Sequence, residues 1–309
     1  MYVQTIFGRK KPEELGITYI HEHLYSNPPQ WVKEQDSDLV LDDILCSIQE
    51  AKTFKKVGGQ TIVDMTAVDY GRNIEILRSI AKAAKINVIA TTGFNKGLFF
   101  DKWVYEAEEK DLTEWMITEI TEGIEATDSK AGIIKVGSGY NKISQVEEKV
   151  IRAASKAHLE TGAPIAAHTE SGTMALEQLE IMEKEGVDLN KVIIAHADRN
   201  IDLWYFKQIG KKGAYIEFDG PSKIKYYPDS MRVDAIIELV KSGFEDKILI
   251  SGDMARKSYL EAYGGGPGFR FIIQKFIPRL KMQFDEEGLN PDIVNKFIVL
   301  NPQRALTFK

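Results

Sequence analysis

Four of the five histidines in this 309-residue chain lie close to the end of a short apolar run. His21 and His23 come near the end of GITYIHEHL, His168 near the end of PIAAHTE and His196 near the end of KVIIAHA. Asp253 is the last residue of a further run, KILISGD. Imidazole nitrogens and carboxylate oxygens are ligands of zinc, and manganese, cobalt and iron accept them as well. The pattern therefore predicts a metal centre.

The spacing of these residues favours two metal ions. Side chains two residues apart on a strand point to the same side, so His21 and His23 can bind one ion together. His168 and His196 come from neighbouring runs and could hold a second ion nearby. Glu22 alternates away from the histidines, and we expect it to face outward. The letters HEH do not form the helical HExxH zinc motif, which separates its histidines by a full helical turn.

Lys135 lies near the end of another apolar run, AGIIKVG, and would reach the same place as the histidines. An ammonium group beside two dications is electrostatically unfavourable. The amine could stay neutral and act as a general base, or it could react with carbon dioxide to form a carbamate. A carbamate is an anion with a pair of oxygens, so it can bridge two metal ions. A lysine that extends from a strand end toward solvent is a third alternative, and the residue types leave all three open.

Eight apolar runs alternate with amphipathic stretches, which predicts parallel strands joined by crossover helices. We expect the strands near residues 17–24, 60–66, 87–93, 131–137, 164–169, 191–197, 213–219 and 247–253. An open doubly wound sheet is the alternative, but no GxGxxG or P-loop follows the first run. We therefore predict an α/β fold, a (β/α)8 TIM barrel in a single domain over residues 1–309. In such a barrel the carboxyl ends of all strands meet on one face, where active sites lie.

Composition and charge limit the class of protein. Asp and Glu (46) outnumber Lys and Arg (40), and the formal net charge of −6 disfavours binding to nucleic acid or a membrane surface. No run of about 18 apolar residues could span a membrane, and the first residues lack the apolar core of a secretory signal, so we expect a cytoplasmic protein. The single cysteine, Cys46, cannot form an internal disulfide and is expected to be a small buried hydrophobe. His158, in a helical stretch, is expected at the surface.

The ordered set of histidines, lysine and aspartate resembles the metal site of the phosphotriesterase family of the amidohydrolase superfamily. The matching segments are GITYIHEHL, AGIIKVG, IAAHTESGT, VIIAHADR and ILISGDM, and the resemblance extends from residue 16 to Leu306. It implies two divalent metal ions per chain, for which we expect zinc, with manganese, cobalt or iron as alternatives. The implied ligands are His21, His23, Lys135, His168, His196 and Asp253.

The resemblance also implies a mechanism. Asp253 and the first two of these histidines hold the more buried ion, the other two hold the exposed ion, and a Lys135 carboxylated by carbon dioxide bridges them together with a hydroxide. That hydroxide would attack the substrate carbonyl, and the exposed ion would stabilise the oxyanion. Asp253 would accept the proton and pass it to the leaving alkoxide. Related deoxyribonucleases of the TatD type carry glutamate in place of Lys135, which argues against that activity.

Family members act on organophosphate triesters, acyl-homoserine lactones and sugar lactones, including phosphorylated ones. The loops after the last two apolar runs carry Tyr226, Tyr259 and a set of cations. We expect these cations to bind substrate: Lys223, Lys225, Arg256 and Lys257. Because barrels often bind phosphate on these loops, we predict a small anionic substrate, a phosphorylated sugar lactone. Solvated surface charge is the alternative interpretation of the cations.

Other functions remain open at this point. Phe94, Phe99 and Trp103 could form an apolar wall for an acyl-homoserine lactone, and hydrolysis of an organophosphate triester is a further alternative. A protein of a different class, which binds metal without turnover, would also retain ligands, but the complete ligand set with Asp253 argues against it. A homodimer is compatible with the sequence, which does not determine the oligomeric state.

Overall fold

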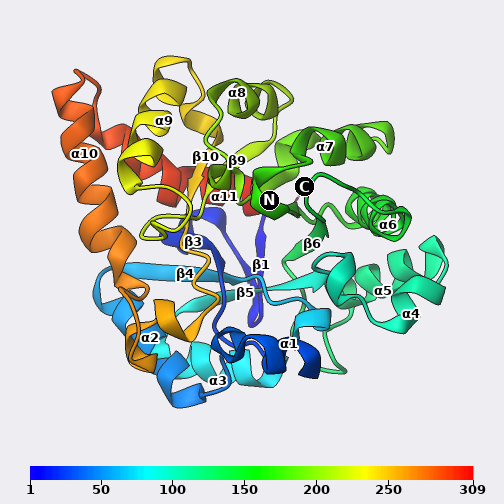
Figure 1. Cartoon of the computed structure of the whole chain (residues 1–309). Coiled ribbons are helices and arrows are strands. Elements are labelled where there is room, and N and C mark those ends of the chain that lie inside the picture. The colour runs from blue at the N-terminus through cyan, green and yellow to red at the C-terminus, as the bar shows by residue number, and fades with distance from the viewer. Residues whose placement is uncertain (309) are drawn as a thin grey trace.

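Eight parallel strands form the centre of the structure, a computed structural model that describes residues 1–308. They pair side by side in chain order and curve round a common axis inside a ring of helices (Figure 1). These strands are β3 (Ile17–Glu22), β4 (Gly59–Asp64), β5 (Asn87–Gly93), β6 (Ile133–Ser138), β7 (Ile165–Thr169), β8 (Val192–Ala195), β9 (Tyr215–Phe218) and β10 (Ile248–Ile250). The first and last strands meet where His21 N donates to Ser251 Oγ and Asp253 N donates to His21 O, both at 2.9 Å. The predicted (β/α)8 TIM barrel is confirmed.

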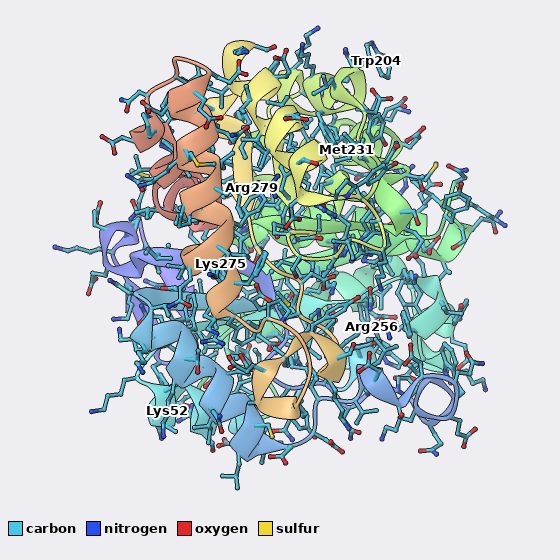
Figure 2. All side chains as sticks on the ribbon, turned by 60° about the vertical axis from the view of Figure 1, so that its left-hand side comes forward. Lys52, Trp204, Met231, Arg256, Lys275 and Arg279 are labelled. Atoms are coloured by element: carbon cyan, nitrogen blue, oxygen red, sulfur yellow. The ribbon has the colours of Figure 1, made fainter. Side chains whose placement is uncertain are left out.

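Helices form the outer layer of the barrel. They are α1 (Gln30–Gln35), α2 (Ile44–Lys56), α3 (Ile74–Ala84), α4 (Lys102–Glu106), α5 (Glu109–Thr121), α6 (Gln145–Thr161), α7 (Ala175–Lys184), α8 (Leu203–Lys211), α9 (Asp229–Lys241), α10 (Ile277–Glu286) and α11 (Asn301–Leu306). Apolar residues recur at helical spacing in α3 and are buried against the strands, whereas Lys52, Trp204 and Arg279 point outward from α2, α8 and α10 (Figure 2). Among the described residues, no helix has the length and apolar character needed to cross a membrane.

Apolar side chains fill the barrel interior. A short hairpin of β1 (Val3–Thr5) and β2 (Gly8–Lys10) precedes the barrel and contributes one of them. The interior cluster consists of Val3, Leu15, Ile20, Val63, Met65, Ile89, Ile133, Ala166, Ile193, Tyr215, Leu249, Ala305 and Leu306. Because the interior is packed and is not a pore, polar side chains that point toward the axis gather beyond this cluster, at the carboxyl ends of the strands.

An irregularity in β3 aims the first histidine. The pairing of β3 with β4 shifts register between Tyr19 and Glu22, so that β3 holds one extra residue there. Ile20 can therefore remain in the interior cluster while the next residue, His21, also faces the axis. Bulges of this kind commonly re-aim a side chain beside an active site.

Two expectations about single residues are wrong. His158 is buried, because it lies on the inner face of α6, and its Nδ1 is 2.7 Å from the carbonyl oxygen of Ala163. Cys46 is half-buried, in a helix turn whose neighbour Leu45 is 77% exposed. Its Sγ donates to the carbonyl oxygen of Ala262, in the loop after β10, at 3.2 Å.

Candidate active site

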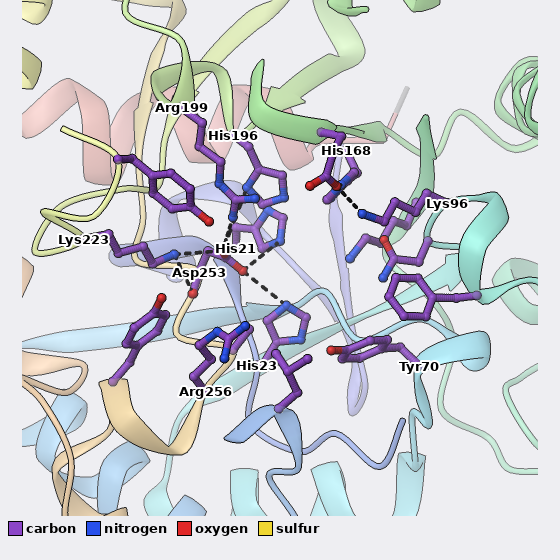
Figure 3. Close-up of a pocket in the computed structure, with 18 of the residues that line it drawn as sticks. His21, His23, Tyr70, Lys96, His168, His196, Arg199, Lys223, Asp253 and Arg256 are labelled. Atoms are coloured by element: carbon purple, nitrogen blue, oxygen red, sulfur yellow. Dashed lines mark hydrogen bonds and ion pairs between the residues drawn. The ribbon is translucent and has the colours of Figure 1, made fainter. Parts of the chain in front are cut away.

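A cavity of about 210 Å³ opens at the carboxyl ends of the strands (Figure 3). It is lined by His21, His23, Leu39, Tyr70, Asn95, Lys96, Phe99, Lys135, His168, Glu170, His196, Arg199, Lys223, Lys225, Tyr226, Asp253, Ala255, Arg256 and Tyr259. All of the predicted metal ligands are among these residues, together with Lys223, Lys225 and Arg256. Lys257 is not; its Nζ lies 3.8 Å from Asp42 Oδ1, outside the cavity lining.

His21, His23 and Asp253 converge on one point. Nε2 of His21 lies 3.8 Å from Asp253 Oδ1, and Nε2 of His23 lies 3.5 Å from the same oxygen (Figure 3). No described residue forms a hydrogen bond with the buried His21 Nε2, and such an atom in a folded protein requires an explanation, for which an ion is one candidate. Burial lowers the pKa of His21, which favours the neutral imidazole that binds metals. These residues fit a divalent cation.

His168 and His196 lie next to His21. The ring centroid of His196 is 4.8 Å from that of His21 and 4.6 Å from that of His168. Asp219 Oδ2 accepts from the main-chain N of His196 at 2.8 Å and lies 2.7 Å from His196 Nδ1, which forms no hydrogen bond within residues 1–308. Glu170 Oε2 lies 3.1 Å from His168 Nε2, and burial lowers the pKa of His168 to about 4. A carboxylate therefore orients the ring of His168, whereas the His196 ring has a carboxylate beside it and a nitrogen without a hydrogen bond.

Lys135 extends from β6 into the interior beside these histidines. Only 3% of it is exposed, so it does not extend to solvent, and its Nζ donates to the carbonyl oxygen of Met65 at 2.7 Å. Burial lowers the pKa of this amine, and the nearby carboxylate of Asp253 opposes that effect without cancelling it. Since carbon dioxide reacts with the neutral amine, these surroundings favour the form that carboxylation requires.

Asp253 is held from two directions. Arg199 Nη2 donates to Oδ2 at 2.5 Å, and Lys223 Nζ donates to Oδ2 at 2.8 Å and to the carbonyl oxygen of Asp253 at 2.7 Å (Figure 3). Lys223 thus joins the main chain and side chain of a residue whose φ of 41° lies in the left-handed region. Burial alone would raise the pKa of this carboxyl group. Nearby charges and a hydrogen bond outweigh burial and hold the pKa well below its usual range; they come from Lys223, His23, His196 and Arg199. The two cations leave Oδ1 facing the histidines.

Glu22 points away from the histidines but does not face solvent, so the expectation for its environment is wrong. Its Oε1 accepts from Gly252 N at 2.7 Å and from Ser251 Oγ at 3.1 Å, and its Oε2 accepts from Met254 N at 2.9 Å. Two of these donors flank Asp253 in the chain. The glutamate of the HEH sequence therefore closes the barrel between β3 and β10 and fixes the main chain on both sides of the catalytic candidate.

Lys225 differs from Lys223, the other cation of the loop after β9. Its Nζ lies 5.0 Å from the ring centroid of Tyr226 and 5.3 Å from that of Tyr259. It is exposed, and it forms no ion pair with a carboxylate of residues 1–308. Lys223, two residues earlier, is buried and bound to Asp253. Lys225 is therefore the lysine of this loop that remains available to an anion in the cavity.

Arg256 forms hydrogen bonds to carboxylates through only one of its three guanidinium nitrogens in the described part of the chain. Its Nη1 donates to Asp36 Oδ2 at 2.7 Å and lies 3.3 Å from Asp38 Oδ2. None of the hydrogen bonds within the described part of the chain uses its Nε or Nη2. The acids from the loop after β3 thus hold the guanidinium at the cavity wall and leave two of its nitrogens free to donate.

The predicted apolar wall is mostly absent from the cavity. Phe99 lines it, whereas Phe94 is fully buried and stacks on Trp115 with ring centroids 5.1 Å apart. Trp103 packs edge-on against Phe94 and is not among the lining residues. A single aromatic residue of the predicted three therefore meets the cavity.

Sequence reasoning missed several groups that touch the predicted ligands. Arg199 lies three residues after His196. Glu217 and Asp219 lie at the end of the apolar run GAYIEFD, just as Asp253 lies at the end of the run KILISGD. Their position at the end of an apolar run could have identified these two carboxylates as candidate site residues. Ligand atoms of His21, His196 and Asp219 lie within 4.8 Å of one another, so Asp219 belongs to the immediate surroundings of the centre. Asn95, after β5, had no recognisable signal.

The chain matches known proteins over nearly its whole length. A family model described as "Phosphotriesterase family" matches residues 1–306. A protein of Mycoplasmopsis synoviae named phospho-furanose lactonase is 34% identical over 329 residues, 99% of this chain and 92% of that protein. The crystal structure of a lactonase from Listeria monocytogenes has a TM-score of 0.97 and 44% identity, and the match covers 100% of both chains. The Escherichia coli phosphotriesterase homology protein, crystallised with phosphate in its active site, has a TM-score of 0.89 and 34% identity, over 95% of this chain and 99% of that one.

Proposed function

This chain belongs to the phosphotriesterase family and is a hydrolase, and on that premise we propose that it opens the ring of a phosphorylated sugar lactone. The observation that carries the proposal is the pair of available cations, Lys225 and Arg256, which line the same small cavity as the predicted metal ligands. Charge-assisted hydrogen bonds from both would hold a phosphate group there. The relative named phospho-furanose lactonase and the phosphate in the active site of the Escherichia coli protein support this chemistry.

The residues that we assign to a pair of divalent ions are all buried. They are His21, His23, Lys135, His168, His196 and Asp253. The assignment is supported by the convergence of His21 with His23 and Asp253 and with His196 and Asp219, by the unsatisfied nitrogen of His21, and by the depressed pKa of the Lys135 amine. A carboxylated Lys135 would supply an anionic ligand to the ions, and the nitrogen and oxygen donors suit zinc first, with manganese, cobalt or iron as alternatives. Such ions would supply Lewis acidity and a water of lowered pKa.

We assign proton transfer to Asp253. Ring opening forms a bond between the oxygen of a water and the carbonyl carbon, and it breaks the bond from that carbon to the ring oxygen. Asp253 can take the proton that the water loses and deliver it to the ring oxygen, which stays on the product as a hydroxyl group. Arg199 and Lys223 fix the carboxylate for this task.

The alternative substrates have less support. A long acyl chain would extend beyond a cavity of about 210 Å³ whose predicted apolar wall is reduced to Phe99. A neutral organophosphate triester would not use the charges of Lys225 and Arg256. A binding protein without turnover would have no need of Asp253 held between Arg199 and Lys223.

A hydrolysis screen of neutral, acylated and phosphorylated lactones, with metal analysis of the same sample, tests the proposal. We expect about two divalent ions per chain, because six candidate ligands exceed what one tetrahedral site uses, and fastest turnover with a phosphorylated sugar lactone. One ion or fewer after growth in metal-supplemented medium would contradict the binuclear assignment. An acyl-homoserine lactone as best substrate would contradict the assigned substrate class.

A further inference from the structure

Asn95 carries a buried polar atom that the fold does not satisfy. The residue is 8% exposed and lines the cavity, yet its Oδ1 forms no hydrogen bond with any part of residues 1–308. Buried amide groups in folded proteins nearly always have partners, and leaving one unpaired is unfavourable. An unpaired amide at the wall of an active-site cavity is therefore suited to a partner that arrives with the substrate.

The main chain around Asn95 is fixed beside the predicted metal ligand Lys135. Phe94 N donates to the carbonyl oxygen of Lys135 at 2.9 Å, and Asn95 N lies 2.9 and 3.2 Å from the two carboxylate oxygens of Asp69. The packing is so close that a Cβ at Gly137 would lie 2.5 Å from the carbonyl oxygen of Asn95. The main chain of Asn95 is thus held before substrate binds, which favours a precise contact by its side chain.

The neighbouring charges on this wall satisfy each other. Lys96 and Glu170 form an ion pair, and Glu170 also contacts His168 (Figure 3). Asn95 is therefore a neutral residue of the wall whose buried Oδ1 has no hydrogen-bond partner within residues 1–308. Lys96 and Lys223 appear on opposite sides of the cavity in Figure 3, so the segment with Asn95 faces the loop that carries Lys225.

We infer that Asn95 is a specificity-determining residue that binds a ring hydroxyl of the substrate. A hydroxyl both donates and accepts, so it can pair with either end of the amide. Phosphate on the side of Lys225 and a hydroxyl at Asn95 would hold the lactone ring between the two walls. The inference rests on the proposed function for the phosphate, and it narrows the substrate to lactones with free ring hydroxyls.

The test is a comparison of one variant across matched substrates. Asn95→Leu keeps the size of the side chain and removes its hydrogen bonds. kcat/KM is measured for the best lactone of the screen and for analogues that each lack one ring hydroxyl. We expect Asn95→Leu to lower kcat/KM roughly 5- to 150-fold for the parent lactone, and to have little effect on one of the deoxy analogues. Phe99→Leu, on the same side of the cavity, is the control and should affect all of these lactones alike.

Metal content of each variant is measured as well, because Asn95 lies close to Lys135. Asn95→Ala replaces Asn95→Leu if the leucine variant does not fold. An equal loss on the parent lactone and on every deoxy analogue would overturn the inference, as would a best substrate without ring hydroxyls. If the wild type prefers an unphosphorylated sugar lactone, the phosphate assignment fails, and the same comparison on that lactone still decides the role of Asn95.

Discussion

The two sides of the cavity are built in different ways. Side chains at the strand ends, such as His21 and Lys135, are 1% and 3% exposed and are positioned by the register of the barrel. Lys225 and Arg256, on the loops after β9 and β10, are exposed and half-buried, and whether they form ion pairs depends on which other loops lie beside them. Arg256, for example, is held by two acids more than two hundred residues earlier in the chain.

This difference separates two tasks. In the proposed function, the strand ends hold the groups that would act on any lactone carbonyl, whereas the loops hold groups that would distinguish one lactone from another. A substitution at a strand end should therefore lower turnover of all substrates alike. A substitution on the loops should change the preference among substrates and leave the metal in place. The following predictions examine this division, from the largest effect to the smallest.

Lys135→Ala should abolish activity on every lactone and should lose metal at the same time, because it removes the proposed bridging anion. Acetate in the buffer should restore part of both by filling the gap. Lys135→Glu should retain more metal than Lys135→Ala, since its carboxylate supplies the same charge over a shorter reach. Metal analysis and hydrolysis rates are measured together. Full activity of Lys135→Ala without added acid would exclude the bridge.

Asp253→Asn should lower kcat by about 10²-fold or more on phosphorylated and unphosphorylated lactones alike, the usual scale for a general acid–base group. The amide keeps the shape and a weak oxygen ligand but cannot take the proton. Metal content should fall less than in His21→Ala, which provides the matched comparison. Normal turnover in this variant would place proton transfer at another group.

Lys225→Met and Arg256→Met should each lower kcat/KM roughly 10- to 150-fold for a phosphorylated lactone, because a charge-assisted contact contributes ~1.5–3 kcal/mol. The dephosphorylated analogue should be nearly unaffected, and metal content should not change. Both substrates are assayed with both variants. A loss of the same size on the two substrates would show that these residues support the fold of the cavity instead of the phosphate.

Lys257→Met should have the smallest effect, within about twofold on either lactone, since interactions between exposed charges contribute little. Lys257 lies in the same loop as Arg256 but next to Asp42, away from the cavity lining. It is therefore the matched control for removal of a positive charge. A selective loss on the phosphorylated lactone in this variant would mean that the loop after β10 moves when substrate binds.

The same division explains what could be predicted from the sequence. Strand ends follow from hydrophobic pattern, and in a barrel the carboxyl ends of strands necessarily meet, so His168 and His196 could be placed together from spacing alone. The bulge that aims His21 left no trace in the residue types. The expectation that Glu22 faces outward was wrong. Alternation along a strand predicts the side to which a residue points. Whether that side meets solvent depends on how β3 packs against β10, which the local sequence does not show.

Loop charges could be predicted only as a set. The four cations after β9 and β10 look alike in sequence, yet Lys223 binds Asp253, Lys257 lies near Asp42, and Arg256 is held by acids of another loop. These pairings join segments far apart in the chain, and no local pattern encodes them. Asn95 is a clearer case, since its significance depends on a hydrogen bond that the folded chain does not make.

The most direct test of this account is the ratio of kcat/KM for a phosphorylated sugar lactone to kcat/KM for its dephosphorylated analogue, measured with the wild-type protein loaded with metal. If Lys225 and Arg256 select the substrate while the strand ends perform the chemistry, the ratio should be about tenfold or more, the contribution of at least one charge-assisted contact. A ratio near one, with both lactones hydrolysed, would contradict the account.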